Sequence, residues 1–166
     1  NRGIGLALVS EYVARGDEVI AVCRRSSPAL DECKARIIPD INVTDGNALK
    51  RLQHQLQGET IDVLIHNAGI MVRDTFADCE IDNLRTQFEV NTLGPLRLVQ
   101  ALKACLSSSS KVAVITSRMG SIEDNTSGGY YGYRISKCGV NMVVKCLSLD
   151  LQHEGIAVGV FHPGYV

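Results

Sequence analysis

The chain has 166 residues, of which 45% are hydrophobic and 21% charged, and its formal net charge is -1. This length fits one domain with a real core, and a nearly neutral chain gives no electrostatic reason to bind nucleic acid or an anionic membrane. No apolar run approaches the roughly 20 residues of a membrane span. The six cysteines form no Cys-x-x-Cys pair and no zinc-type cluster, so we expect a cytoplasmic protein with reduced thiols and no metal site.

The first third of the chain alternates helical and strand patterns. Residues 1–5 predict a glycine turn that enters a helix, because apolar residues recur at positions 6, 9, 12 and 13. A strand covered on both faces follows at 18–23, and a second strand at 37–43 contains Pro39, which limits its pairing. A turn with capping chemistry at 44–46 then leads into an exposed amphipathic helix.

The same alternation continues to the end of the chain. We expect strands at 61–66, 111–116 and 156–161, and helices at 47–57, at 81–106 with a break near Pro95, and from Tyr133 to about 153. Residues 107–110 are a short serine run, and 120–129 form a polar loop rich in glycine. Strands that alternate with helices predict parallel βαβ units, hence one Rossmann-type, doubly wound α/β domain over residues 1–166.

In such a sheet, ligands bind beyond the carboxyl ends of the strands. The residues at those ends and in the opening turn are Gly3-Ile4-Gly5, Arg24, Asn42-Val43, Asn67-Ala68-Gly69, Ser117 and Pro163-Gly164. Glycines before a helix let a pyrophosphate approach its positive end, although a Gly-x-Gly alone is also a common turn. Arginine at a strand end suits a ribose 2′-phosphate, whereas Arg25 is equally well explained as a solvated charge.

Tyr133 and Lys137 are four residues apart, so on a helix they lie one turn apart on one face. A neighbouring cation favours the phenolate and makes a tyrosine more useful for proton transfer near neutral pH. Ser117 follows a strand and could hold a substrate oxygen together with Tyr133. The oxygen would then accept a proton from Tyr133 as a nicotinamide delivers hydride. Each residue also has an ordinary explanation, as a surface pair or a loop serine.

Taken together, these motifs resemble the short-chain dehydrogenase/reductase family, and most closely its carbonyl-reductase-like branch with the C-factor and Sniffer proteins. The matching segments run in the family's order over nearly the whole chain. They are Asn1-Arg2-Gly3-Ile4-Gly5 for the end of the glycine turn, Asn67-Ala68-Gly69, Asn91 in its helix, Ser117 with Tyr133 and Lys137, and Pro163-Gly164.

The resemblance implies roles for these residues. Tyr133 would be the proton donor and acceptor, Ser117 would orient the carbonyl, and Asn91 would complete a water-linked proton relay through Lys137. Arg2 and Arg24 favour NADP(H), with NAD(H) as the alternative. The implied cofactor-binding residues are Arg2, Gly3, Ile4, Gly5, Arg24, Asn42, Val43, Asn67, Ala68, Gly69, Tyr133, Lys137, Pro163, Gly164 and Val166.

The chain also departs from the family pattern. Asn42 replaces an aspartate, and His66 replaces an asparagine; we interpret His66 and His162 as structural residues. The family's first strand, its substrate lid and its last strand are missing. We therefore expect a portion of a longer protein, in which a central strand would lie between the strands at Val19 and Val63.

The leading functional hypothesis is an NADP(H)-dependent oxidoreductase that interconverts a ketone or aldehyde with an alcohol. The alternative is a non-catalytic dinucleotide-binding or signalling member of the same fold, and an epimerase or dehydratase is a third. The helices that carry Asn91 and Tyr133 are apolar on more than one face, which also suggests a homo-oligomer formed through them.

Overall fold

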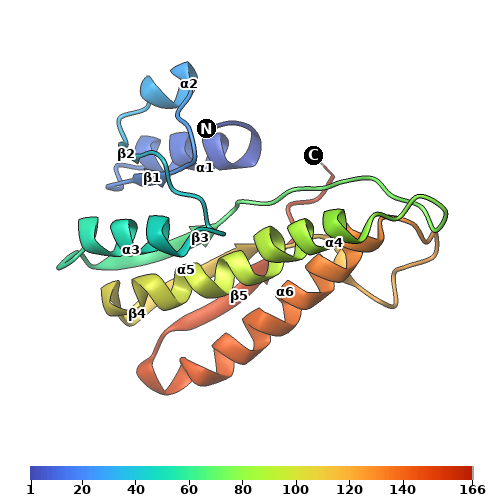
Figure 1. Ribbon diagram of the computed structural model, residues 1–166. Coiled ribbons are helices and arrows are strands. Elements are labelled where there is room, and N and C mark those ends of the chain that lie inside the picture. Colours follow the sequence, from blue (N-terminus) through green and yellow to red (C-terminus); the bar gives the residue numbers. More distant parts are fainter. Residues whose placement is uncertain (166) are drawn as a thin grey trace.

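The computed structural model describes residues 1–165, and within them five parallel strands form two sheets (Figure 1). One sheet pairs β1 (Ile20–Val22) with β2 (Arg36–Ile38), and the other has the order β3 (Ile61–His66), β4 (Leu106–Ile115), β5 (Ala157–Phe161). No ladder joins β1 to β3 within residues 1–165, so the described strands divide into two sheets between β1 and β3. Parallel strands with helical crossovers confirm the Rossmann-type α/β class.

Helices connect every pair of consecutive strands in the described part of the chain. The longer helices are α1 (Gly3–Ala14), α3 (Gly46–Gln55), α4 (Ile81–Phe88), α5 (Gly94–Leu102) and α6 (Tyr131–Asp150). The short ones are α2 (Pro28–Asp31), the π-helix η1 (Glu89–Leu93) and the 3₁₀-helices η2 (Lys103–Cys105), η3 (Arg118–Gly120) and η4 (Gln152–Glu154).

Two apolar clusters form the core, and α5 contributes to both. In one, Leu52 of α3 and Leu102 of α5 pack with Ile38 of β2. In the other, Val140 and Val144 of α6 pack on β4 through buried residues such as Val114. The helices α3, α5 and α6 therefore lie along the three-stranded sheet (Figure 1), and the burial of these side chains holds the carboxyl ends of its strands in place.

The N-terminal half differs from the sequence prediction in four places. The strands predicted at 18–23 and 37–43 are shorter, at Ile20–Val22 and Arg36–Ile38, so Asn42 and Val43 follow β2 instead of lying in it. The α1 helix already begins at Gly3, so the residues predicted as a glycine turn form its first turn instead. The prediction also missed α2, which Ser27 caps by accepting a hydrogen bond of 3.3 Å from the Leu30 amide. The β2 strand ends immediately before Pro39, which agrees with the limit expected from that proline.

The long helix predicted over 81–106 is divided near Pro95 as expected, by the π-helix η1, which ends at Leu93. The serine run was wrongly placed outside the sheet, because β4 begins at Leu106 and includes it. Ser110 explains the error: its Oγ donates to the carbonyl of Ile61 at 2.6 Å and accepts from the Ser107 amide at 2.8 Å. Side-chain bonds thus support a polar strand where the pairing register shifts.

Candidate active site

The α6 helix places Tyr133 and Lys137 one turn apart, as the spacing predicts. Lys137 is only 5% exposed, and its Nζ donates a hydrogen bond of 2.9 Å to the main-chain carbonyl of Ile115. The same Nζ lies 5.7 Å from the centre of the Tyr133 ring. The end of β4 thereby fixes a cation beside a half-buried phenol.

Burial lowers the pKa of Lys137 to about 8, because a desolvated ammonium is disfavoured. Its one carbonyl partner compensates for part of the lost hydration. At neutral pH the group therefore still carries its positive charge, but it loses that charge at a lower pH than a solvent-exposed lysine would. The charge on which the proposed chemistry depends is thus available only up to mildly alkaline pH.

Asn91 lies buried in η1, and its side chain is fully engaged. Its Oδ1 accepts from the Ile70 amide, while its Nδ2 donates to the Ile70 carbonyl, both at 2.8 Å, and to Ser136 Oγ at 2.9 Å. A Cβ placed on Gly69 would lie 3.4 Å from Asn91 Oδ1 and 3.7 Å from Lys137 Nζ. Three residues predicted for the site, from three different elements, therefore meet at the end of β3.

Ser117 lies two residues beyond Ile115, the last residue of β4, and is the N-cap of η3. Its Oγ accepts a hydrogen bond of 3.2 Å from the Met119 amide, and no acceptor takes its proton within the part of the chain that the structure describes. Gly120 lies against α6, where an added Cβ would come within 2.7 Å of the Lys137 carbonyl. The loop that carries Ser117 is thus packed on α6, the helix of Tyr133. The Ser117 hydroxyl remains able to donate a hydrogen bond.

The start of α1 lies against the end of β3. A Cβ on Gly5 would approach Asn67 Nδ2 to 2.7 Å, so only glycine permits this contact without a shift. Nearby predicted cofactor residues line a cavity of about 600 Å³ bounded by Asn1, Arg2, Arg24, Arg25, Asp40 and Asn42. The structure therefore brings Arg2, Arg24 and Asn42 together, and this basic, polar lining fits an anionic group next to a sugar.

The other predicted cofactor residues lie in α1 and in the loops that follow the strands. Ile4 is half-buried in the first turn of α1, and Gly3 there has a positive φ of 53°. Val43 packs against the start of α5, since a Cβ on Gly94 would lie 2.9 Å from its Cγ2. Ala68 is exposed beside Gly69, and Pro163 and Gly164 are exposed after β5. Val166 lies outside the described residues.

His66 ends β3 in a buried position, and its Nε2 has no hydrogen-bond partner among residues 1–165. Burial, and then the charge of Lys137, lower the pKa of His66 to about 4, so it is neutral at physiological pH. Among the described residues, no group of histidine, cysteine or acidic side chains is suited to hold a metal ion. Residues 1–165 also contain no helix that is long and apolar enough to cross a membrane.

Two contributors to the site were missed from the sequence. Ser136 accepts from Asn91 and donates from Oγ to the Tyr133 carbonyl at 2.8 Å, which links η1 to α6. Asp74 binds the first amides of α6 from 57 residues away. The separation explains why local sequence patterns did not reveal it, because capping signals are read within a few residues of a helix end.

Known proteins resemble this chain in sequence and in fold. The sequence profile of the short chain dehydrogenase family matches residues 1–166. The chain belongs to the short-chain dehydrogenase family. It is therefore an oxidoreductase of that family.

Among its relatives is the 1-hydroxy-2-glutathionyl-2-methyl-3-butene dehydrogenase of Rhodococcus sp. (strain AD45). It is 38% identical over 168 residues, which cover 100% of this chain and 74% of that protein. Two solved structures, each 30% identical, show the same fold. The NADPH-bound carbonyl reductase from chicken fatty liver has a TM-score of 0.87 over 98% of this chain and 75% of its own. The Sniffer protein of Caenorhabditis elegans has a TM-score of 0.89 over 99% and 80%.

Proposed function

We propose that this short-chain dehydrogenase is an NADP(H)-dependent oxidoreductase that interconverts a ketone or aldehyde with an alcohol. The observation that carries the proposal is the Lys137 ammonium, which is buried, bound to Ile115 and 5.7 Å from the Tyr133 ring. A surface pair would leave the lysine in water. A desolvated cation beside a phenol is instead expected where a phenolate must be stabilised.

Each residue of the site has its own role in the proposed reaction. The chemistry that bound NADP(H) supplies is hydride transfer to or from the carbonyl carbon. Ser117 donates its free hydroxyl proton to the substrate oxygen and orients it. Tyr133 gives that oxygen its proton during reduction, and Lys137 stabilises the phenolate that remains.

Asn91 has a supporting part in this proposal. Both of its amide hydrogens are bound to Ile70 and Ser136, so its side chain has none left for a water beside Lys137. We therefore propose that Asn91 takes part in a proton relay through its main-chain carbonyl. That carbonyl lies in a π-helix, where the regular helical hydrogen-bond pattern is interrupted.

The cavity lined by Arg2 and Arg24 supports NADP(H) rather than NAD(H) as the cofactor. Guanidinium groups match phosphate geometry, and an acidic residue in place of Arg24 would instead bind a ribose hydroxyl. The solved carbonyl reductase from chicken fatty liver is an NADPH complex, which is consistent with this choice. Asp40 on the same cavity wall leaves the lining net positive, because three arginines face it.

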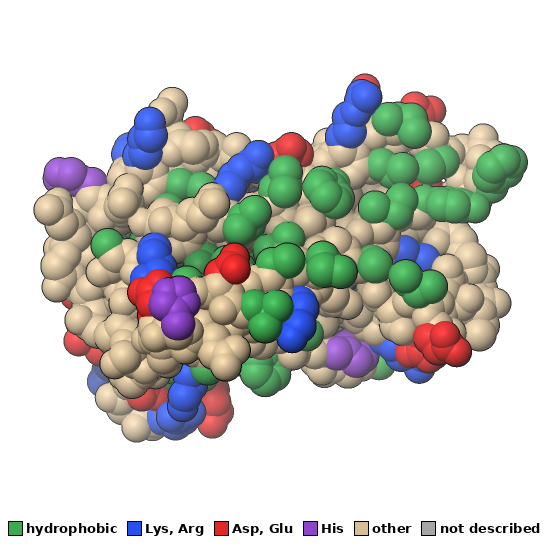
Figure 2. Space-filling view, turned by 90° about the horizontal axis from the view of Figure 1, so that it is seen from below, with side chains coloured by type: hydrophobic (Ala, Val, Ile, Leu, Met, Phe, Trp, Pro, Cys, Tyr) green, Lys and Arg blue, Asp and Glu red, His purple; other side chains and the backbone are tan. Residues whose placement is uncertain are grey.

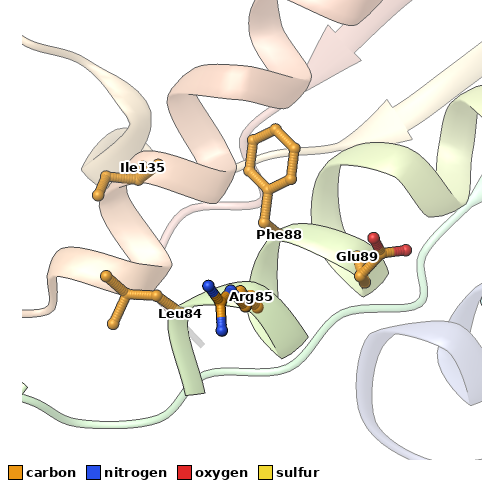
Figure 3. Close-up of a pocket in the computed structure, with 5 residues that line it drawn as sticks. All are labelled: Leu84, Arg85, Phe88, Glu89 and Ile135. Atoms are coloured by element: carbon orange, nitrogen blue, oxygen red, sulfur yellow. The ribbon is translucent and has the colours of Figure 1, made fainter. Parts of the chain in front are cut away.

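We also propose that a second copy of the protein packs on α4 and α6. Leu84, Arg85, Phe88, Glu89 and Ile135 line a shallow pocket of about 240 Å³ there (Figure 3). Ile135 is 51% exposed, and Figure 2 shows hydrophobic side chains gathered across the face of the molecule seen from below. Both charged residues of the pocket are already paired within one copy, Arg85 with Asp82 at 2.8 Å and Glu89 with Arg97 at 2.6 Å, so the apolar side chains would carry the contact. None of the described cysteines forms a disulfide, which supports the cytoplasm as the location.

The deciding experiment measures NADPH consumption by the full-length protein with a panel of ketones and aldehydes, together with NADPH binding by fluorescence. Turnover of at least one compound is expected. Tight binding of NADPH without turnover of any compound would favour the non-catalytic, dinucleotide-binding alternative.

A further inference from the structure

The segment after β3 is bound at every second residue to a different helical element. Ile70 is held by the Asn91 side chain in η1, through bonds to both its amide and its carbonyl. The Val72 amide donates to Gln87 Oε1 of α4 at 2.9 Å. Asp74 then binds the start of α6. We call residues 69–74 the strap, because it crosses from the end of β3 to the first turn of the helix that carries Tyr133.

The residue at the N-cap of α6 does not cap the helix with its side chain. Tyr130, its N-cap, has a left-handed φ of 52°, and its side chain makes no cap hydrogen bond within the described residues. The two preceding residues, Gly128 and Gly129, also have positive φ angles of 64° and 61°. The first turn of α6 contains no acidic residue. A helix that starts from such a turn leaves its first amides unsatisfied unless another segment supplies acceptors.

Asp74 supplies those acceptors. Its Oδ1 accepts from the Tyr131 amide at 2.5 Å, its Oδ2 from the Gly132 amide at 3.2 Å, and its main-chain carbonyl from the Tyr130 amide at 2.9 Å. The side chain is only 6% exposed, so water competes little for these bonds. Its negative charge also lies at the positive end of the helix.

We propose that Asp74 is a positioning residue for Tyr133, an inference that rests on the function proposed above. Tyr133 is the third residue of α6, directly after the two residues whose amides bind the Asp74 carboxylate. The strap begins at Gly69, beside Asn91 and Lys137, and ends at Asp74. It therefore holds the first turn of α6 in register with the lysine site. Loss of the carboxylate frays that turn and displaces the phenol, while Lys137 stays bound to Ile115.

The test uses the full-length protein with three variants: Asp74→Ala, Asp74→Asn and, as the matched control, Asp78→Ala. Asp78 lies on an exposed part of the same loop, and among the described residues its carboxylate binds only Thr75. We expect Asp74→Ala to lower kcat by about tenfold or more, because displacement of a reacting group is costly, with less than a threefold change in the Kd for NADPH. Asp74→Asn keeps one acceptor oxygen and should recover part of the loss. Asp78→Ala should match the wild type.

Hydrogen exchange of the Tyr131 and Gly132 amides, which the Asp74 carboxylate binds, gives a second readout that does not depend on turnover. In Asp74→Ala these amides should exchange at least about ten times faster than in the wild type, while those of residues 140–147 are unchanged. Unchanged exchange, or a kcat within twofold of wild type in the folded Ala variant, overturns the proposal. If the wild type binds NADPH but reduces no carbonyl, the proposed function fails, and the exchange data alone decide whether Asp74 positions Tyr133.

Discussion

Nζ of Lys137 donates a hydrogen bond of 2.9 Å to the carbonyl of Ile115, the last residue of β4. This bond joins α6 to the carboxyl end of the middle strand of the three-stranded sheet. It holds a desolvated ammonium at 5.7 Å from the Tyr133 ring while Ser117, two residues beyond Ile115, emerges from the same strand end. The proposed proton chemistry depends on this junction between α6 and β4.

Replacement of Tyr133 by phenylalanine should abolish carbonyl reduction and preserve cofactor binding. Loss of a general acid typically costs a factor of about 100 to 10,000 in rate, whereas the ring that fills the site remains. Steady-state kinetics and NADPH fluorescence measure the two effects. Tyr12→Phe is the matched control, because Tyr12 lies near the far end of α1 with Arg15 over its ring at 4.9 Å. Turnover that is unchanged in Tyr133→Phe would contradict the mechanism.

The rate of reduction should fall above about pH 8. Burial lowers the pKa of Lys137 to about 8, so the ammonium that stabilises the phenolate is lost as the pH rises through that value. Profiles of kcat/KM between pH 6 and 10 measure the effect, and nuclear magnetic resonance of ¹³C-labelled lysine reports the titration of Lys137 directly. Lys137→Arg stays charged in this range and should lose the alkaline decrease, although its larger side chain lowers the overall rate. The same decrease in the arginine variant would assign it to another group.

Arg24→Ala should weaken NADPH binding and leave NADH binding nearly unchanged. A lost charge-assisted bond to a phosphate typically costs a factor of about 10 to 100 in affinity. Titration of both cofactors by fluorescence separates a phosphate contact from a general loss of the site. Arg15→Ala removes a cation that pairs with Asp17 at 3.3 Å and serves as the control. An equal loss of affinity for both cofactors would show that Arg24 does not bind the 2′-phosphate.

Much of the fold follows from sequence periodicity, because strongly patterned segments bury their apolar face in only one way. β3 was predicted over its full observed range, and the break before Pro95 has its expected place. The serine run was misread because its hydroxyls satisfy the backbone inside the sheet, a contact that involves Ile61, 49 residues earlier. The same reasoning explains the site. Tyr133 and Lys137 are four residues apart and were found, whereas the bonds of Asp74 to α6 span 57 residues and were not.

Acid should destabilise the protein through His66. Its pKa is about 4 in the folded state and near 6.5 in an unfolded chain, so the unfolded state binds more protons between these values. The free energy of unfolding should therefore fall as the pH decreases from about 6.5 towards 4, by roughly 2 to 3 kcal/mol. Urea titrations at pH 7 and pH 4.5 measure this loss. His66→Asn cannot titrate and should show a smaller loss, whereas exposed His54→Asn should behave like the wild type.

Gly132→Ala should destabilise the contact between α4 and α6. A Cβ at this position would come within 2.2 Å of Gln87 Nε2 and 3.3 Å of the Leu84 Cα, so the added methyl group cannot be accommodated without a shift. Displacement of Gln87 also releases the Val72 amide of the strap. Overpacking of this kind costs about 1 to 3 kcal/mol, which thermal and urea unfolding can measure. Gly46→Ala is the control: this residue begins α3, has open space within 4 Å and should keep or slightly raise the stability. Equal stability of the two variants would show that Gly132 has room for a methyl group beside Gln87 and Leu84.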